Sequence, residues 1–136
     1  MYKIIDEKAF PTERYCRVTI QSKEGRFTGW SYCHRDDEFS TFVGIKYAEK
    51  RAVAAMCRKK AKIARIQLKA AKRIRNDIWF KYDTLNLDFV KNIKLAIRDY
   101  DNAVKHWTKV ANDLEQSILL DDKKRASILS RYSYKD

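Results

Sequence analysis

The chain has 136 residues and a formal net charge of +12, with three cysteines, three glycines and one proline. A chain of this length hides roughly two-thirds of its unfolded surface, so it can bury a core without disulfides. An odd number of cysteines without a C-x-x-C pair argues against a secreted disulfide framework and against a standard zinc site. No 18-residue apolar run and no signal-peptide core is present, and we therefore expect a cytoplasmic protein.

The first part of the sequence has the alternating pattern of β-strands. Residues Tyr15 to Gln21 alternate between two faces and are rich in β-forming residues. Lys23 to Gly25 suits a turn, and Arg26 to Cys33 has the composition of a returning strand. We predict an antiparallel β-hairpin, to which Tyr2 to Ile5 could add a third strand. Because a two-stranded hairpin is marginal by itself, it is expected to pack on a helix.

A long helix is predicted from about residue 40 to residue 80. Residues His34 to Ser40 supply capping groups and carboxylates, which the N-terminal end of a helix favours. No glycine or proline follows Gly44. An apolar stripe with the helical period is expected to face the core. Its members are Ile45, Ala48, Ala52, Met56, Ile63, Ile66, Ala70 and Ile74.

A second helix, over residues 87–119, has the strongest pattern in the chain. It follows a break at Tyr82 to Asp88, where Asp and Asn side chains suit a new helix start. Its apolar residues recur at alternating steps of three and four, as in a heptad seam. They are Val90, Ile93, Ile97, Tyr100, Val104, Trp107, Ala111, Leu114 and Ile118. We expect this helix to return antiparallel along the first one, although the seam could equally pair two chains, so both a monomer and a homodimer are compatible with it.

These elements predict an α+β fold in a single domain of residues 1–136. A β-hairpin region covers residues 1–39 and packs on a hairpin of two long helices. Asp121 and Asp122 are expected to start a short last helix over residues 121–131, and Tyr132 to Asp136 to form a fraying tail.

Nearly all of the net charge lies in the middle of the chain. Residues 1–41 hold seven basic and seven acidic residues, and residues 77–136 hold eleven and ten. Residues 42–76 hold twelve basic residues and one acid, Glu49, for a net charge of +11. Over the 27 residues from Lys50 to Asn76 no acid is present, so repulsions between neighbouring turns of the helix are uncompensated.

The basic residues form a second stripe on the predicted helix, about 120° around its axis from the apolar stripe. A partner that carries phosphates would remove the repulsion, so nucleic acid or a nucleic-acid-containing complex is the expected partner. The plain alternative is a solvated helix face, but such faces usually mix both signs of charge. The candidate binding residues are Arg51, Arg58, Lys59, Lys62, Arg65, Lys69, Lys72 and Arg73.

Three aromatic residues of the predicted hairpin, Phe27, Trp30 and Tyr32, are candidates for stacking on unpaired bases. Sheet surfaces of RNA-binding domains use aromatic residues in this way. The alternative is that these rings pack on the helix, which is the commoner use of aromatic side chains in a small domain.

Catalytic and metal sites are weakly indicated. A metal site of the nuclease type would need carboxylates such as Asp36, Asp37 and Glu38 beside His34, yet carboxylates at a helix start are usually caps. We therefore predict no enzymatic activity and no cofactor.

A zinc site with cysteine thiolate and histidine imidazole ligands is the other possibility. Cys16 and Cys33 could lie across the hairpin beside His34, with Cys57 or a second chain completing the site. Neighbouring strand residues point to opposite faces, so Cys33 and His34 fit this site poorly. Small buried cysteines are the simpler interpretation, and no metal site is predicted.

The stretch GWSYCHRDDEFSTFVGIKYAEKRA, residues 29–52, resembles a strand-turn-helix element of small accessory proteins from phages and mobile elements of Gram-positive bacteria. The resemblance covers about a sixth of the chain and matches no functional residue. Its matching pieces are Cys33, the turn Asp36 to Phe39, Gly44, Ala48 and the pair Arg51 and Ala52. Proteins of this origin include type II anti-CRISPR proteins, which inhibit an RNA-guided effector nuclease by stoichiometric binding.

The resemblance implies a phage-type anti-CRISPR protein that acts in the cytoplasm of a bacterial host cell. Many such inhibitors are acidic mimics of DNA, whereas this chain is basic. It would therefore dock its basic helix on guide RNA, target DNA or an acidic protein surface of the complex. Two alternatives stay open, namely a general nucleic-acid-binding phage protein of replication or packaging, and a scaffold that meets an acidic partner helix.

Overall fold

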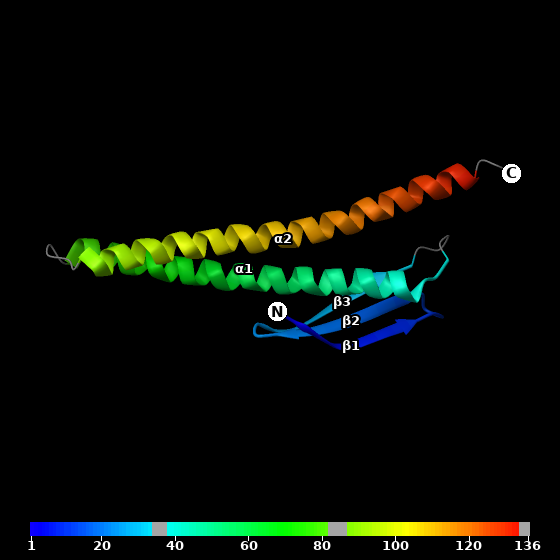
Figure 1. The fold of residues 1–136 in the computed structure, drawn as a ribbon, viewed down its shortest axis with the longest axis horizontal. Helices are drawn as coiled ribbons and strands as arrows, with labels where there is room; N and C mark the ends of the chain where they lie inside the picture. The colour runs from blue at the N-terminus through cyan, green and yellow to red at the C-terminus, as the bar shows by residue number, and fades with distance from the viewer. Residues whose placement is uncertain (34–37, 82–86, 134–136) are drawn as a thin grey trace. The chain divides into compact units, whose positions relative to one another are not determined.

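The computed structural model describes the backbone of residues 1–33, 38–81 and 87–133 and the side chains of residues 1–33, 38–77 and 88–120. Three strands are followed by two long helices, which confirms the predicted α+β class (Figure 1). The elements are β1 (Lys3–Phe10), β2 (Tyr15–Ser22), β3 (Gly25–Tyr32), α1 (Thr41–Lys81) and α2 (Leu87–Ser133). The chain groups into two compact units, and each helix contributes to both. One unit comprises Met1–Met56 with Val110–Asp136, and the other comprises Cys57–Lys109. The expectation of a single domain stays a prediction.

The strands form an antiparallel sheet in the order β1-β2-β3. The predicted hairpin is therefore present, and the third strand extends further than expected, to Phe10. In the central strand β2, Tyr15 pairs with Phe10 on one side and with Tyr32 on the other. Gly25 supplies the positive φ of 128° that the β2–β3 turn requires.

One face of the sheet is buried and the other is not, as the period of two requires. Cys16, Val18 and Ile20 of β2 point to the buried face and are fully inaccessible to solvent. At Gly29 of β3 a side chain would overlap with the backbone of Ala48 in α1, so the strand and the helix lie in direct backbone contact. Because α1 covers the face that carries Gly29, the opposite face of the sheet is free of α1.

Helix α1 begins where the sequence indicated. The backbone N–H of Val43 donates to Ser40 Oγ at 3.4 Å, and that of Gly44 donates to the Ser40 carbonyl at 2.9 Å, so Ser40 is the N-cap. The other predicted capping residues, Asp36 and Asp37, lie outside the described residues, and so does the predicted break over residues 82–86.

The predicted apolar stripe of α1 is correct near the sheet and wrong beyond it. Ala48, Ala52 and Met56 are buried, but Ile66 and Ile74 are 61% and 49% exposed, and Ala70 is exposed as well. The buried line there consists of Cys57, Ala61 and Ala64, which lie about 140° around the helix axis from the predicted stripe. Small side chains let two helix backbones approach closely, so the alanine-rich line packs and the larger isoleucines stay outside.

Helix α2 confirms the heptad prediction, because each of the nine seam residues is buried or half-buried. Within each unit, the part of α2 that belongs to it contacts α1. Lys50 Nζ donates to Ser117 Oγ at 3.2 Å in one unit, and the Lys60 ammonium stands 5.0 Å from the Trp107 ring centre in the other. Trp107 of the seam thus makes a contact within the chain.

The predicted short helix over residues 121–131 is not a separate element. Helix α2 continues through Asp121 and Asp122 to Ser133, because no glycine or proline interrupts it and aspartate is tolerated on a helix surface. The predicted tail is helical up to Ser133, and residues 134–136 lie outside the described part. Within the described residues, neither helix has a stretch long and apolar enough to span a membrane.

Candidate nucleic-acid interface

The first candidate surface is the basic face of α1. It consists of the eight predicted binding residues, and all eight side chains are exposed. At 100° per residue, most of them lie about 100° around the axis from the buried line of Cys57, Ala61 and Ala64. The members of the basic face are Arg51, Arg58, Lys59, Lys62, Arg65, Lys69, Lys72 and Arg73. The helix therefore buries one side and presents cations on the adjacent side.

Two members of the basic face also hold the fold together. The Arg51 guanidinium donates to the Trp30 carbonyl at 2.6 Å and so links α1 to β3. The Arg65 guanidinium donates to Thr108 Oγ1 of α2 at 3.4 Å. Sequence reasoning assigned both residues to binding alone. Arg51 in particular has a structural contact that a charge count does not reveal.

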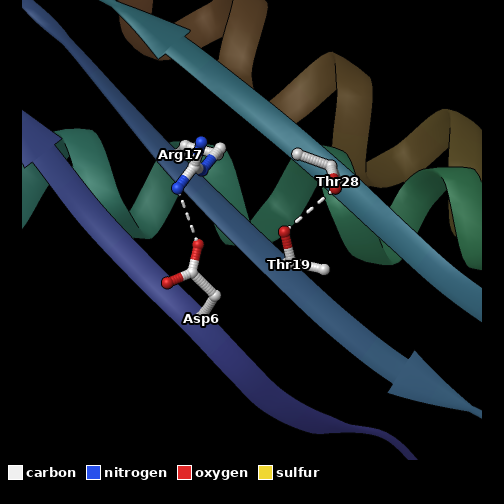
Figure 2. Close-up of polar contacts among 4 residues, drawn as sticks. All are labelled: Asp6, Arg17, Thr19 and Thr28. Carbon is white, nitrogen blue, oxygen red and sulfur yellow. Dashed lines mark hydrogen bonds and ion pairs between the residues drawn. The ribbon is translucent and has the colours of Figure 1, made fainter.

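The second candidate surface is the outer face of the sheet, on the side away from the helices (Figure 2). Figure 2 shows the polar part of this outer face. Arg17 donates to the Asp6 carboxylate at 3.0 Å, and the hydroxyls of Thr19 and Thr28 share a hydrogen bond of 2.9 Å. These contacts run across the three strands and leave the outer face open in the described part of the chain.

The other end of this outer face is aromatic. The Tyr15 ring lies at the centre, with its centroid 4.5 Å from Phe10, 5.5 Å from Trp30 and 5.8 Å from Tyr32. The Phe10 and Tyr15 rings are stacked at 25°. Trp30 is 38% exposed and Tyr32 is 71% exposed. We call Phe10, Tyr15, Trp30 and Tyr32 the aromatic cluster.

Two cations adjoin the aromatic cluster. The Arg17 guanidinium stands over the rings of Phe10 and Trp30, at 5.6 and 5.7 Å from their centroids. The Lys8 ammonium stands 5.0 Å from the Phe10 centroid. Cation and ring faces attract one another at these distances. The sheet thus combines flat apolar surfaces with positive charge.

The predicted stacking residues are only partly brought together. Trp30 and Tyr32 belong to the aromatic cluster, whereas Phe27 does not. Phe27 pairs with buried Ile20 and lies on the inner face, because it is an odd number of residues from Trp30. Sequence reasoning missed Phe10 and Tyr15. Tyr15 was detectable, since the alternation already placed it on the same face as Arg17.

The cysteine and carboxylate candidates form no site that the structure describes. Among the described residues, no three His, Cys, Asp or Glu side chains come close enough to hold a metal. Burial, together with the nearby Cys33, raises the pKa of the Cys16 thiol, so Cys16 stays neutral near pH 7. His34, Asp36 and Asp37 lie outside the described residues.

Known protein families, curated proteins and solved structures give no match to this chain.

Proposed function

We propose that the protein is a non-catalytic binding module that attaches to nucleic acid through the basic face of α1. The observation that carries this proposal is the exposure of all eight cationic side chains on one helix, within a segment that holds no acid from Lys50 to Asn76. Cations at i and i+4 repel one another, and a row of phosphates would turn that repulsion into attraction.

A helix surface of this kind suits the phosphate backbone better than it suits base edges. Lysine and arginine contacts to phosphate position a protein but carry no sequence information. We therefore expect binding with little sequence preference and with a strong dependence on salt. Neutralising about six phosphates of duplex DNA gives a slope of about −5 in a plot of log affinity against log salt.

The test is the binding of a 20-base-pair DNA duplex, followed by fluorescence anisotropy between 50 and 200 mM NaCl. In the variant, four members of the basic face are changed to glutamate, and the slope should fall by about 3 to 4 because four phosphate contacts are lost. The changes are Arg58→Glu, Lys62→Glu, Arg65→Glu and Lys69→Glu. Circular dichroism should show that helix content is retained.

A matched control carries the same change of net charge on the other helix. Its four positions are exposed on α2: Lys91→Glu, Lys94→Glu, Arg98→Glu and Lys109→Glu. The control should keep more of the duplex affinity than the first variant. Equal losses in the two variants would show that bulk charge, rather than the basic face, governs binding. An unaltered protein that binds neither duplex nor single-stranded DNA would refute the proposal outright.

The narrower proposal is that the nucleic acid belongs to a type II CRISPR effector complex, which the protein inhibits by stoichiometric binding. The resemblance of residues 29–52 to phage accessory proteins supports it. Pull-down of the assembled ribonucleoprotein, compared with naked duplex, tests it. Equally tight binding to free duplex would leave nucleic-acid binding intact and would favour a general accessory protein instead, whereas capture of an acidic protein without nucleic acid would favour a scaffold.

A further inference from the structure

We propose that the aromatic cluster on the outer sheet face is a stacking subsite for the unpaired bases of single-stranded nucleic acid. The inference deepens the proposed function, on which it rests, by naming the class of strand. It comes from an independent part of the chain, because the aromatic cluster belongs to the sheet and most of the basic face belongs to the other compact unit.

Two rings of the aromatic cluster are exposed to solvent. Tyr32 contributes little to the core, since 71% of it is accessible, and Trp30 keeps 38% of its surface in solvent. The buried face of the same sheet holds Cys16, Val18 and Ile20, so these rings are not needed to cover the core. Apolar groups that gather into a patch on an exposed surface mark interaction sites, whereas scattered single ones do not.

The rings of the aromatic cluster are spread across all three strands. Phe10, Tyr15 and Tyr32 occupy one row, since Tyr15 pairs with Phe10 in β1 and with Tyr32 in β3. Trp30 follows in the next row, opposite Arg17. Neighbouring strands lie about 4.8 Å apart, so successive rings along a row have the separation that unpaired bases can span.

Positive charge lies beside the rings of the aromatic cluster. The row next to Phe10, Tyr15 and Tyr32 contains two cations. In that row Arg17 pairs with Lys8 on one side and with Trp30 on the other. A nucleic-acid strand whose bases stack on the aromatic cluster would place its phosphates near Lys8 and Arg17. Aromatic surfaces bordered by Lys and Arg are how sequence-tolerant single-strand binders work. The Asp6 carboxylate opposes this attraction, since it pairs with Arg17 at 3.0 Å.

The decisive probe is a pair of 12-nucleotide strands with the same phosphates. One is oligothymidylate, and the other is an abasic strand of equal length, which cannot stack. The unaltered protein should bind oligothymidylate about tenfold or more tightly than the abasic strand, because each stacked base contributes about 1–3 kcal/mol. The four changes in the basic face should weaken binding of both strands.

Variants of the cluster separate stacking from charge. Tyr32→Ala and Trp30→Ala should lower the affinity for oligothymidylate toward that for the abasic strand and leave the abasic affinity unchanged. A matched control is Phe42→Ala, which removes an aromatic ring that is 79% exposed on α1, outside the sheet. Phe42→Ala should bind both strands like the unaltered protein, and thermal melting should show that Tyr32→Ala is folded.

Each outcome decides the matter. Equal affinity for the two strands overturns the stacking subsite and leaves the basic face standing. Failure to bind duplex and both strands overturns the proposed function as well. Self-association of the unaltered protein in light scattering that Tyr32→Ala abolishes, without base-dependent binding, would assign the aromatic cluster to contacts between copies of this chain and so overturn the proposal.

Discussion

Gly29 of β3 faces the backbone carbonyl of Ala48 in α1 so closely that any side chain at residue 29 would overlap with it. The amide nitrogen of Ala52 is 2.6 Å from the same Cβ position. Because these are backbone atoms of a helix, they cannot turn aside as a side chain could. This contact holds the inner face of the sheet on α1 and leaves the outer face, with the aromatic cluster, open.

Gly29→Ala should therefore be among the costliest single changes in the chain. Overpacking against a rigid backbone costs about 3 kcal/mol of unfolding free energy, which urea denaturation measures. Thr28→Ala is the control, because Thr28 is adjacent in the same strand and points outward, where it loses only its hydrogen bond with Thr19. That loss is about 1 kcal/mol. Similar stabilities for the two variants would disprove the direct contact.

Gly44→Ala should be destabilising for a different reason. Its methyl group would collide with the Cys16 sulfur, and Cys16 is fully buried. The clash should exceed the gain in helix propensity, which is about 1 kcal/mol. In the Cys16→Ala background the sulfur is gone, so Gly44→Ala should become neutral or stabilising. A double-mutant cycle should give a coupling of about 1 kcal/mol or more, and additive effects would argue against contact between the two residues.

Two substitutions in α1 test whether its core-facing residues are those of the buried line or those of the predicted apolar stripe. Ile66→Ala should cost less than about 1 kcal/mol, because Ile66 is 61% exposed. Ala64→Leu should cost about 1–3 kcal/mol, because Ala64 is buried and a larger side chain would push α2 away. Both losses are measured by urea denaturation. A larger loss for Ile66→Ala than for Ala64→Leu would show that the predicted stripe with Ile66 faces the core after all.

The hydrogen bond between Tyr2 and Glu49 should stabilise the fold less at alkaline pH. Its hydroxyl donates to Glu49 at 2.7 Å, and this hydrogen bond, with partial burial and the negative charge of Glu49, raises the pKa of Tyr2 to about 12. Below pH 10 the phenol is protonated in both states, so its contribution to stability is complete. Between about pH 10 and 12 the unfolded chain loses the proton first, and the contribution disappears.

The measurement compares the unaltered protein with Tyr2→Phe by urea denaturation at pH 9 and pH 11. Lysines also titrate in this range, so the difference between the two proteins is the quantity to follow, and it should shrink as the pH rises. Glu49→Gln should reduce the effect, because it removes the charge that opposes ionisation. A difference that stays constant across the range would rule out the link between Tyr2 and Glu49.

Asp6 should limit the binding of single strands. Its carboxylate holds the Arg17 guanidinium and repels phosphates, so Asp6→Asn should raise the affinity for oligothymidylate several-fold. Glu7→Gln makes the same change of charge at the next residue, which pairs with Val18 and so lies on the inner-facing side of β1. It should raise the affinity less. Equal gains would indicate a general charge effect rather than a role for Arg17.

The order of the elements and most of their boundaries follow from local patterns in the sequence. The alternation in β2, the N-cap at Ser40 and the heptad of α2 are local patterns, and each was found where it was predicted. The exposure of the basic face followed from the same logic, because lysine and arginine side chains seldom enter a core. Local patterns fail where a separate helix over residues 121–131 was expected, since acidic pairs alone do not break a helix.

Which surfaces come together depends on the packing of several elements and follows from no single local pattern. Strand register placed Phe10 beside Tyr15 and Tyr32, and no pattern within a single strand contains that information. The choice of the line through Ala61 and Ala64 over Ile66 depended on how closely α2 could approach, a property of two helices together. Periodicity identifies candidate faces on one element, whereas the partner element selects which face is buried and which stays free to bind.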